Sequence, residues 1–204
     1  MDPQDTAEFA ALLARAPGDG GGAGRRDELA ALARRPGPDG HEQLTALLSE
    51  YGRPLWEQEV AAFTLGCAGD RRAFETLVFL LNHRDADRGA TAAHALARLR
   101  DPRTARAAAA LATNELRVAY ALHPVRLLTS LRAPESAPAL VTVLTALLAG
   151  PAAPTELALA CVAGLGALGD PAGRDVLARA ADVPQLSAAA QAALARLDEG
   201  PQKG

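Results

Sequence analysis

The chain has 204 residues, of which 49% are hydrophobic, 22% are charged and only 3% are aromatic, so its length suits one domain or a small array of repeats. Because the apolar residues are mostly Ala and Leu, we expect the core to form by close approach of helices, and strand-rich folds are disfavoured. The formal net charge of -3 gives no general attraction for nucleic acid or anionic lipid, and two cysteines are too few for a disulfide scaffold. Arginine greatly outnumbers lysine, which together with the abundant Ala, Gly and Pro is typical of GC-rich coding, so we expect a bacterial source.

The amino-terminal sequence MDPQDTAEFA has no basic stretch followed by an apolar one, which disfavours a secretion signal and favours a cytoplasmic location. Two amphipathic helices are predicted, in DTAEFAALLARA and RRDELAALARR, with the glycine-rich run 18–24 as a flexible linker between them. No Gly-Lys-Ser/Thr follows this run and no apolar strand precedes it, which argues against a phosphate-binding loop. We expect residues 1–37 to cap the repeats that follow.

After these helices the chain repeats itself. A Leu-x-x-(Leu/Ala) pair followed by a turn ends five segments, and the leading leucines are 31, 32, 37 and 29 residues apart. They are Leu65, Leu96, Leu128, Leu165 and Leu194. After most of these turns a new apolar helix is predicted, often on Asp-Pro as at Asp101 and Asp170, where Asp suits the N-cap and Pro the first helical position. Each unit is thus a helix A, a turn and a helix B, which bury their apolar faces only by stacking.

These repeats resemble the HEAT repeat, most closely its short bacterial form named after phycobilisome lyases, and NHRDADRGATAAHALARLRDP at 82–102 is the clearest copy. The resemblance covers about Pro38 to Leu197. It implies an all-α fold, a right-handed α-solenoid of stacked antiparallel helix pairs with about ten to twelve helices. Residues 38–198 would form about five helix pairs, and residues 199–204 a disordered tail. Such repeats occur in scaffolds, adaptors, lyases and nucleic-acid enzymes, so the family describes a shape rather than an activity.

Three residues depart from the repeat pattern. Glu57 in the first unit and Arg88 in the second replace the apolar residue that is usual near the start of helix B. Pro124 lies in the middle of the third predicted B helix, where its missing N–H removes a backbone hydrogen bond and its ring crowds the preceding turn. We expect the helix to bend or break near Tyr120.

The sequence carries no complete catalytic or metal-binding signature. HEQLT at 41–45 lacks the second histidine of a zinc-binding helix, and no serine lies in Gly-x-Ser-x-Gly. Asp85 and Asp87 are predicted to cap a helix rather than to hold a cation. Cys67 and Cys161 lie three repeats apart, too far for a disulfide, and neither is an obvious nucleophile. We therefore assign no catalytic, cofactor-binding or metal-binding residue and expect a protein that is not an enzyme.

Partner-binding residues are predicted on the B helices. With the leading leucine as position zero, positions -9, -5, -2 and +2 lie opposite the core stripe, on the face that lines the concave side of such a stack. The candidates are Trp56, Phe63, Thr91, His94, Arg98, His123 and Arg126. Residues in the same register on stacked helices lie side by side, so one continuous exposed patch is predicted. Its members are His94, Arg98, His123 and Arg126.

A second interpretation remains open for Trp56 and Phe63. Five of the seven aromatic residues lie between Tyr51 and Phe79, and the amino-terminal helices need an apolar surface on which to pack. These two side chains would then be covered rather than available to a partner.

Charge is unevenly distributed along the chain. Residues 1–83 carry 8 basic and 13 acidic side chains, residues 84–132 carry 9 and 4, and residues 133–204 carry 4 and 7. A positive central band would attract an acidic peptide, or pair with the negative ends in a head-to-tail oligomer. An ordinary solvated surface would have the same composition, so the oligomeric state stays open.

From these observations we predict a scaffold or adaptor that binds a protein partner, with an acidic segment, on the concave B-helix face, and has no cofactor and no membrane contact. Two alternatives remain. A nucleic-acid-binding HEAT-like protein would need a broad basic surface, which the acidic total disfavours. A lyase or chaperone subunit acting on a partner protein is suggested by the name of the repeat family alone.

Overall fold

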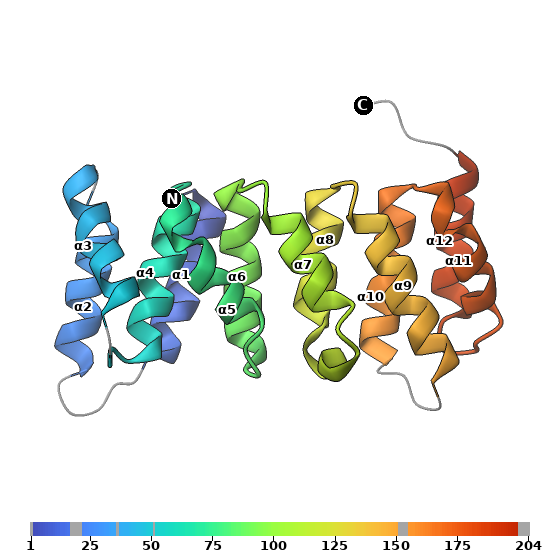
Figure 1. The fold of residues 1–204 in the computed structure, drawn as a ribbon, viewed down its shortest axis with the longest axis horizontal. Coiled ribbons are helices and arrows are strands. Elements are labelled where there is room, and N and C mark those ends of the chain that lie inside the picture. Colours follow the sequence, from blue (N-terminus) through green and yellow to red (C-terminus); the bar gives the residue numbers. More distant parts are fainter. Residues whose placement is uncertain (1, 17–21, 36, 51, 151–154, 200–204) are drawn as a thin grey trace. The chain divides into compact units, whose positions relative to one another are not determined.

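The computed structural model describes residues 2–16, 22–35, 37–50, 52–150 and 155–199. Within these ranges the regular elements are twelve α-helices and three short 3-10 helices, with no strand (Figure 1). The predicted all-α class is therefore confirmed. The chain divides into two compact units, unit 1 (Met1–Thr104) and unit 2 (Ala105–Gly204), each of which is described by itself.

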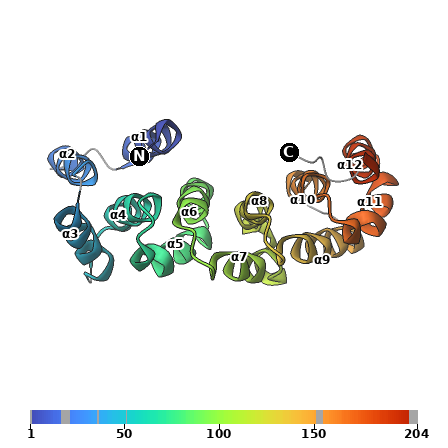
Figure 2. The same cartoon turned by 90° about the horizontal axis from the view of Figure 1, so that it is seen from above.

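Unit 1 is built from helix pairs. Its helices are α1 (Pro3–Arg15), α2 (Gly22–Ala33), α3 (Pro38–Ser49), α4 (Leu55–Cys67), α5 (Phe74–Leu81) and α6 (Ala86–Leu99). The B helices α4 and α6 pack side by side, with the A helices α3 and α5 against their other side (Figure 2). The leading leucines Leu65 and Leu96 are fully buried between the layers, as the repeat pattern predicts. We call the side of the B helices that faces away from the A helices the inner face.

Aspartates begin the elements of unit 1 as expected. The Asp85 side chain accepts a hydrogen bond from the backbone N–H of Asp87 at 3.0 Å, which caps α6. Asp70 and Asp101 accept in the same way from the N–H two residues further on. The predicted capping role of Asp85 is thus confirmed. Asp87 lies in the first turn of α6, where a negative charge interacts favourably with the helix dipole.

Unit 2 is also built from two layers of helices. Its helices are α7 (Thr104–Ala112), at whose start the two units divide, α8 (Leu122–Leu131), α9 (Ser136–Ala149), α10 (Thr155–Leu168), α11 (Arg174–Ala181) and α12 (Ser187–Glu199). The B helix α10 packs against α8 on one side and α12 on the other. A Cβ at Gly166 of α10 would lie 2.8 Å from the Cβ of Ala193 in α12, so only glycine permits this contact. The small residues therefore bring the B helices close together, as the composition predicts.

The predicted break at Pro124 is confirmed. The third B helix starts only at Leu122, after a 3-10 helix (Glu115–Tyr120) in which Arg117 has non-helical φ and ψ of -126° and 21°. Pro124 therefore lies in the first turn of α8. A backbone N–H there has no partner within the helix, so the proline costs no hydrogen bond.

The predicted glycine linker is shorter than expected. Gly22, Ala23 and Gly24 form the first turn of α2 instead of a loop, which corrects the prediction for that part of 18–24. The reason is an anchor just beyond them, because Arg25 forms an ion pair at 3.0 Å with the buried carboxylate of Glu57 in α4. Residues 18–21 of the linker and 200–204 of the predicted tail lie outside the described residues.

None of the described helices combines the length and the apolar character that a membrane span requires.

Candidate functional site

Helix α1 lies on the inner face of unit 1, over α4 and α6 (Figure 2). A capping box starts it, because the Asp2 side chain accepts from the N–H of Asp5 and the Asp5 side chain accepts from the N–H of Asp2. Its apolar side faces the B helices, where Phe9 stacks on Phe63 with ring centroids 6.1 Å apart. Phe63 in turn stacks on the ring of His94, with centroids 5.7 Å apart.

The amino-terminal end of α1 is held by charged groups. The carboxylate of Asp5 is buried, and its Oδ1 lies 2.8 Å from Nε2 of His94 on α6. Nη2 of Arg98, one turn further along α6, donates to Asp5 Oδ2 at 3.3 Å and also forms an ion pair with Asp2. A buried carboxylate is costly unless it is paired, so these contacts fix where Asp5 lies.

The carboxyl-terminal end of α1 is held in the same manner. Nη2 of Arg15 donates to Oγ1 of Thr91 at 2.8 Å and lies 3.4 Å from Oε1 of Glu59. Glu59 is buried in α4, and its second oxygen pairs with Nη1 of Arg88 at 2.9 Å. Helix α1 is therefore attached to α6 at its amino-terminal end and to both α4 and α6 at its carboxyl-terminal end, with aromatic packing between.

These contacts correct the predicted exposed patch. Of the predicted residues in unit 1, Phe63 and Thr91 are buried and His94 is half-buried, whereas Arg98 is exposed. Helix α1 therefore covers part of the predicted surface and leaves Arg98 at its edge. The second interpretation, in which the amino-terminal helices cover the aromatic residues, is the one that holds for Phe63, while Trp56 is half-buried. The physical reason is that α1 has an apolar side of its own to bury, and the inner face offers the Phe63 ring.

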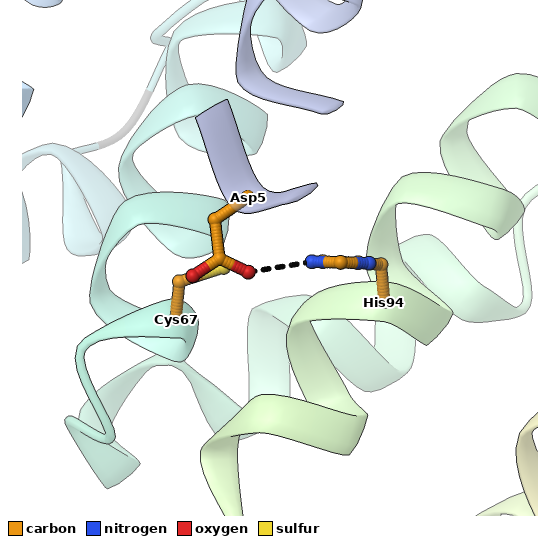
Figure 3. A group of neighbouring side chains, drawn as sticks. All are labelled: Asp5, Cys67 and His94. Carbon is orange, nitrogen blue, oxygen red and sulfur yellow. Dashed lines mark hydrogen bonds and ion pairs between the residues drawn. The ribbon is translucent and has the colours of Figure 1, made fainter. Parts of the chain in front are cut away.

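Beneath α1 the structure also brings together three side chains that the sequence analysis did not connect. The ligand atoms of Asp5, Cys67 and His94 all lie within 4.8 Å of one another (Figure 3). They come from three helices, α1, α4 and α6. Part of this cluster follows from register, because Cys67 and His94 occupy inner-face positions of neighbouring B helices. Asp5 has no such signal, since nothing in the sequence says where α1 docks.

The thiol of Cys67 is not an activated nucleophile. Burial and the nearby Asp5 carboxylate raise its pKa to about 12, so it is protonated at neutral pH. Reactive cysteines have the opposite surroundings, partly exposed and electropositive, which lower the pKa. The second thiol, Cys161, is buried in α10, and burial raises its pKa to about 12 as well.

Acid is expected to release α1 from the inner face. Burial raises the pKa of Asp5, but hydrogen bonds from His94 and the Asp2 N–H and the charge of Arg98 outweigh this, leaving the pKa below its usual 3.8. A lowered folded-state pKa means that the ionised group stabilises the docked state above pH 3.8 and that this stability is lost as the pH falls through the folded-state value. We expect hydrogen exchange of α1 amides, corrected for intrinsic rates, to quicken only below about pH 4.

The variant Asp5→Asn provides the control, because it cannot titrate at this position. Its α1 amides are expected to exchange faster than those of the wild type at neutral pH and to show no further step that depends on residue 5 in acid. The same acid step in both proteins would assign the release to a different group.

The inner face of unit 2 contains an open groove of about 570 Å³. Small residues of α10 line it, among them Ala160, Ala163 and Ala167, and Arg196 reaches it from α12. At one edge the predicted partner-binding residue Arg126 is exposed and forms an ion pair with Glu156 at 3.0 Å. His123, the other predicted residue of α8, is half-buried.

Comparisons with known proteins give little further information. No protein-family model matches the chain, and no curated protein matches it. Among solved structures, it is similar to human deoxyhypusine hydroxylase in complex with glycerol, at 16% sequence identity and a TM-score of 0.35, with 96% of each chain covered. A likeness this distant assigns neither an activity nor a residue to the chain.

Proposed function

We propose that the protein is a helical-repeat scaffold, not an enzyme, that binds an amphipathic helix of a protein partner on the inner face of unit 2. The observation that carries this proposal is α1. The inner face of unit 1 holds this amphipathic helix by aromatic packing at the centre and ion pairs at both ends. An apolar helix side in a groove between helices is a recurrent mode of peptide recognition.

The groove of unit 2 has the chemistry that such a partner requires. Its floor of alanines on α10 lets another helix approach closely, and Ala163 and Ala167 are exposed there. Arg126 and Arg196 also line the groove, so acidic residues that flank the apolar side of the partner helix would form ion pairs with these two guanidinium groups. The ion pair of Arg126 with Glu156 is exposed on both sides and is worth at most about 1 kcal/mol, so a partner can exchange it readily.

The proposal includes a HEAT-like repeat family, a right-handed stack and a cytoplasmic location. The alternatives to it are a nucleic-acid-binding protein and a lyase or chaperone subunit that acts on a partner protein.

Blocking the groove is expected to abolish partner binding. In the variant Ala163→Arg, a long charged side chain would occupy the floor of the groove without burying a new group in the core, because Ala163 is exposed. We expect the proteins captured by the tagged wild type from its native cells, measured by quantitative mass spectrometry, to fall at least about tenfold, or about 1.4 kcal/mol in binding free energy.

The matched control is Ala178→Arg, which makes the same change at an exposed alanine of α11, a helix A. It should capture the same proteins as the wild type. Equal capture by Ala163→Arg and the wild type would remove the groove from the binding site, and thermal melts of both variants check that each is folded.

A further inference from the structure

The cluster beneath α1 combines the three kinds of donor atom that bind zinc in proteins. Asp5 supplies a carboxylate oxygen, Cys67 a sulfur and His94 an imidazole nitrogen (Figure 3). We propose that these residues form a binding site for a divalent transition-metal ion of the zinc class, and that the bound ion ties α1 to α4 and α6.

The spacing of the donors fits this assignment. In a tetrahedral zinc site the metal lies about 2.3 Å from sulfur and about 2.0–2.2 Å from nitrogen or oxygen, so neighbouring ligand atoms are about 3.4–3.6 Å apart. The three atoms here lie within 4.8 Å of one another, and the closest named pair, Asp5 Oδ1 and His94 Nε2, is separated by 2.8 Å. In the metal-free protein a proton bridges Asp5 Oδ1 and His94 Nε2. The metal ion takes the place of this proton, and the two atoms move slightly apart to accommodate it. Side-chain adjustments of about 1 Å complete the site.

The charges around the cluster also balance. Metal binding displaces the proton of the Cys67 thiol into solvent, and the resulting thiolate and the carboxylate of Asp5 together neutralise a divalent cation. The nearby cation Arg98 is itself paired with Asp2, so it adds no net repulsion. Arg98 and the N–H of Asp2 hold Oδ2 of Asp5, leaving Oδ1 turned toward His94. Ligating carboxylates are commonly held by such outer hydrogen bonds.

The donor set selects the metal. Mg²⁺ and Ca²⁺ prefer sites made of oxygen ligands alone, whereas sulfur and imidazole favour zinc and its close chemical relatives. Three protein ligands leave a fourth position for water. Because Asp5 belongs to α1 and the other two ligands belong to the B helices, metal binding and docking of α1 stabilise each other.

Co²⁺ is a suitable probe, because it replaces Zn²⁺ and its thiolate complexes absorb in the near ultraviolet. The full-length protein, kept reduced, is expected to bind one Co²⁺ with this sulfur-to-metal band, and Zn²⁺ should displace it while excess Mg²⁺ should not. The band should be absent in Cys67→Ala. In Asp5→Asn and His94→Gln the affinity for Co²⁺ should fall at least about tenfold.

The chain offers matched controls. Cys161→Ala removes the other thiol, which lies in unit 2. His41→Gln removes another histidine of unit 1, which pairs with Asp70 at 3.6 Å and does not belong to the cluster of Asp5, Cys67 and His94. Both variants should bind Co²⁺ as the wild type does. The proposal is overturned if the wild type shows no sulfur-to-metal band at a Co²⁺ excess, or if the band survives Cys67→Ala.

A second measurement follows α1 itself. Zn²⁺ should slow hydrogen exchange of the α1 amides in the wild type and leave it unchanged in Cys67→Ala, a variant in which the Asp5 contacts to His94 and Arg98 remain. Equal slowing in both proteins would show that the metal acts elsewhere. The result is independent of partner binding on unit 2, because Ala163→Arg leaves all three ligands in place.

Discussion

Replacing Phe63 by Ala is expected to lower the free energy of unfolding of unit 1 by about 3–5 kcal/mol, the range found for buried Phe→Ala changes. The ring is fully buried and lies between two others, Phe9 of α1 and His94 of α6. Its loss leaves a cavity between α4, α1 and α6 and removes the aromatic surface on which α1 packs. Urea unfolding followed by the fluorescence of Trp56, the single tryptophan, reports on the same helix.

Phe79→Ala is the matched control for this change. Phe79 is in the same unit, on α5, but it is 57% exposed, so its removal should cost less than about 1 kcal/mol. Similar costs for the two variants would mean that α1 does not cover the Phe63 ring in solution.

The repeat organisation was largely predictable because its causes are local and periodic. Leu65, Leu96 and their equivalents recur at helix-pair spacing, and burial of the first four follows directly from that spacing. The N-cap at Asp85 and the break before Pro124 depend on the chemistry of single residues, which the sequence states explicitly. The register of neighbouring B helices was also correct in unit 1, where Phe63 and His94 occupy the same position and their rings stack.

The docking of α1 was not predictable in the same way. The apolar side of α1, with Phe9 and Leu12, requires a surface to cover, but amphipathicity does not choose between the end of a stack and its inner face. The choice depends on contacts between residues far apart in the chain, such as Asp5 with His94 and Arg15 with Thr91. The candidate metal site was missed for this reason, since one of its ligands arrives only with α1.

The two units therefore use the same surface differently. In unit 1 the inner face is occupied by a helix of the chain itself, whereas in unit 2 the groove over Ala163 is open. The contacts of α1 indicate which features a helix needs in order to bind there: an aromatic or aliphatic side chain at the centre and acidic groups facing the basic residues of the B helix. Arg98 is the basic residue that meets these acidic groups in unit 1.

Replacing Arg98 by Glu is expected to detach α1 from the inner face. The sequence alone predicts that Arg98→Glu changes only the surface. In the structure, however, Arg98 pairs with Asp2 and with the buried Asp5, and in the variant both carboxylates would face a like charge. Removing the partner of a fully buried charge costs about 3–5 kcal/mol, and because Arg98 is half-exposed we expect about 2–3 kcal/mol. Exchange of the α1 amides should then be about 30- to 150-fold faster, measured by mass spectrometry. Arg179→Glu, the same charge reversal at an exposed position of α11, should leave α1 unchanged. Unaltered protection of α1 in the Arg98 variant would show that aromatic packing alone holds the helix.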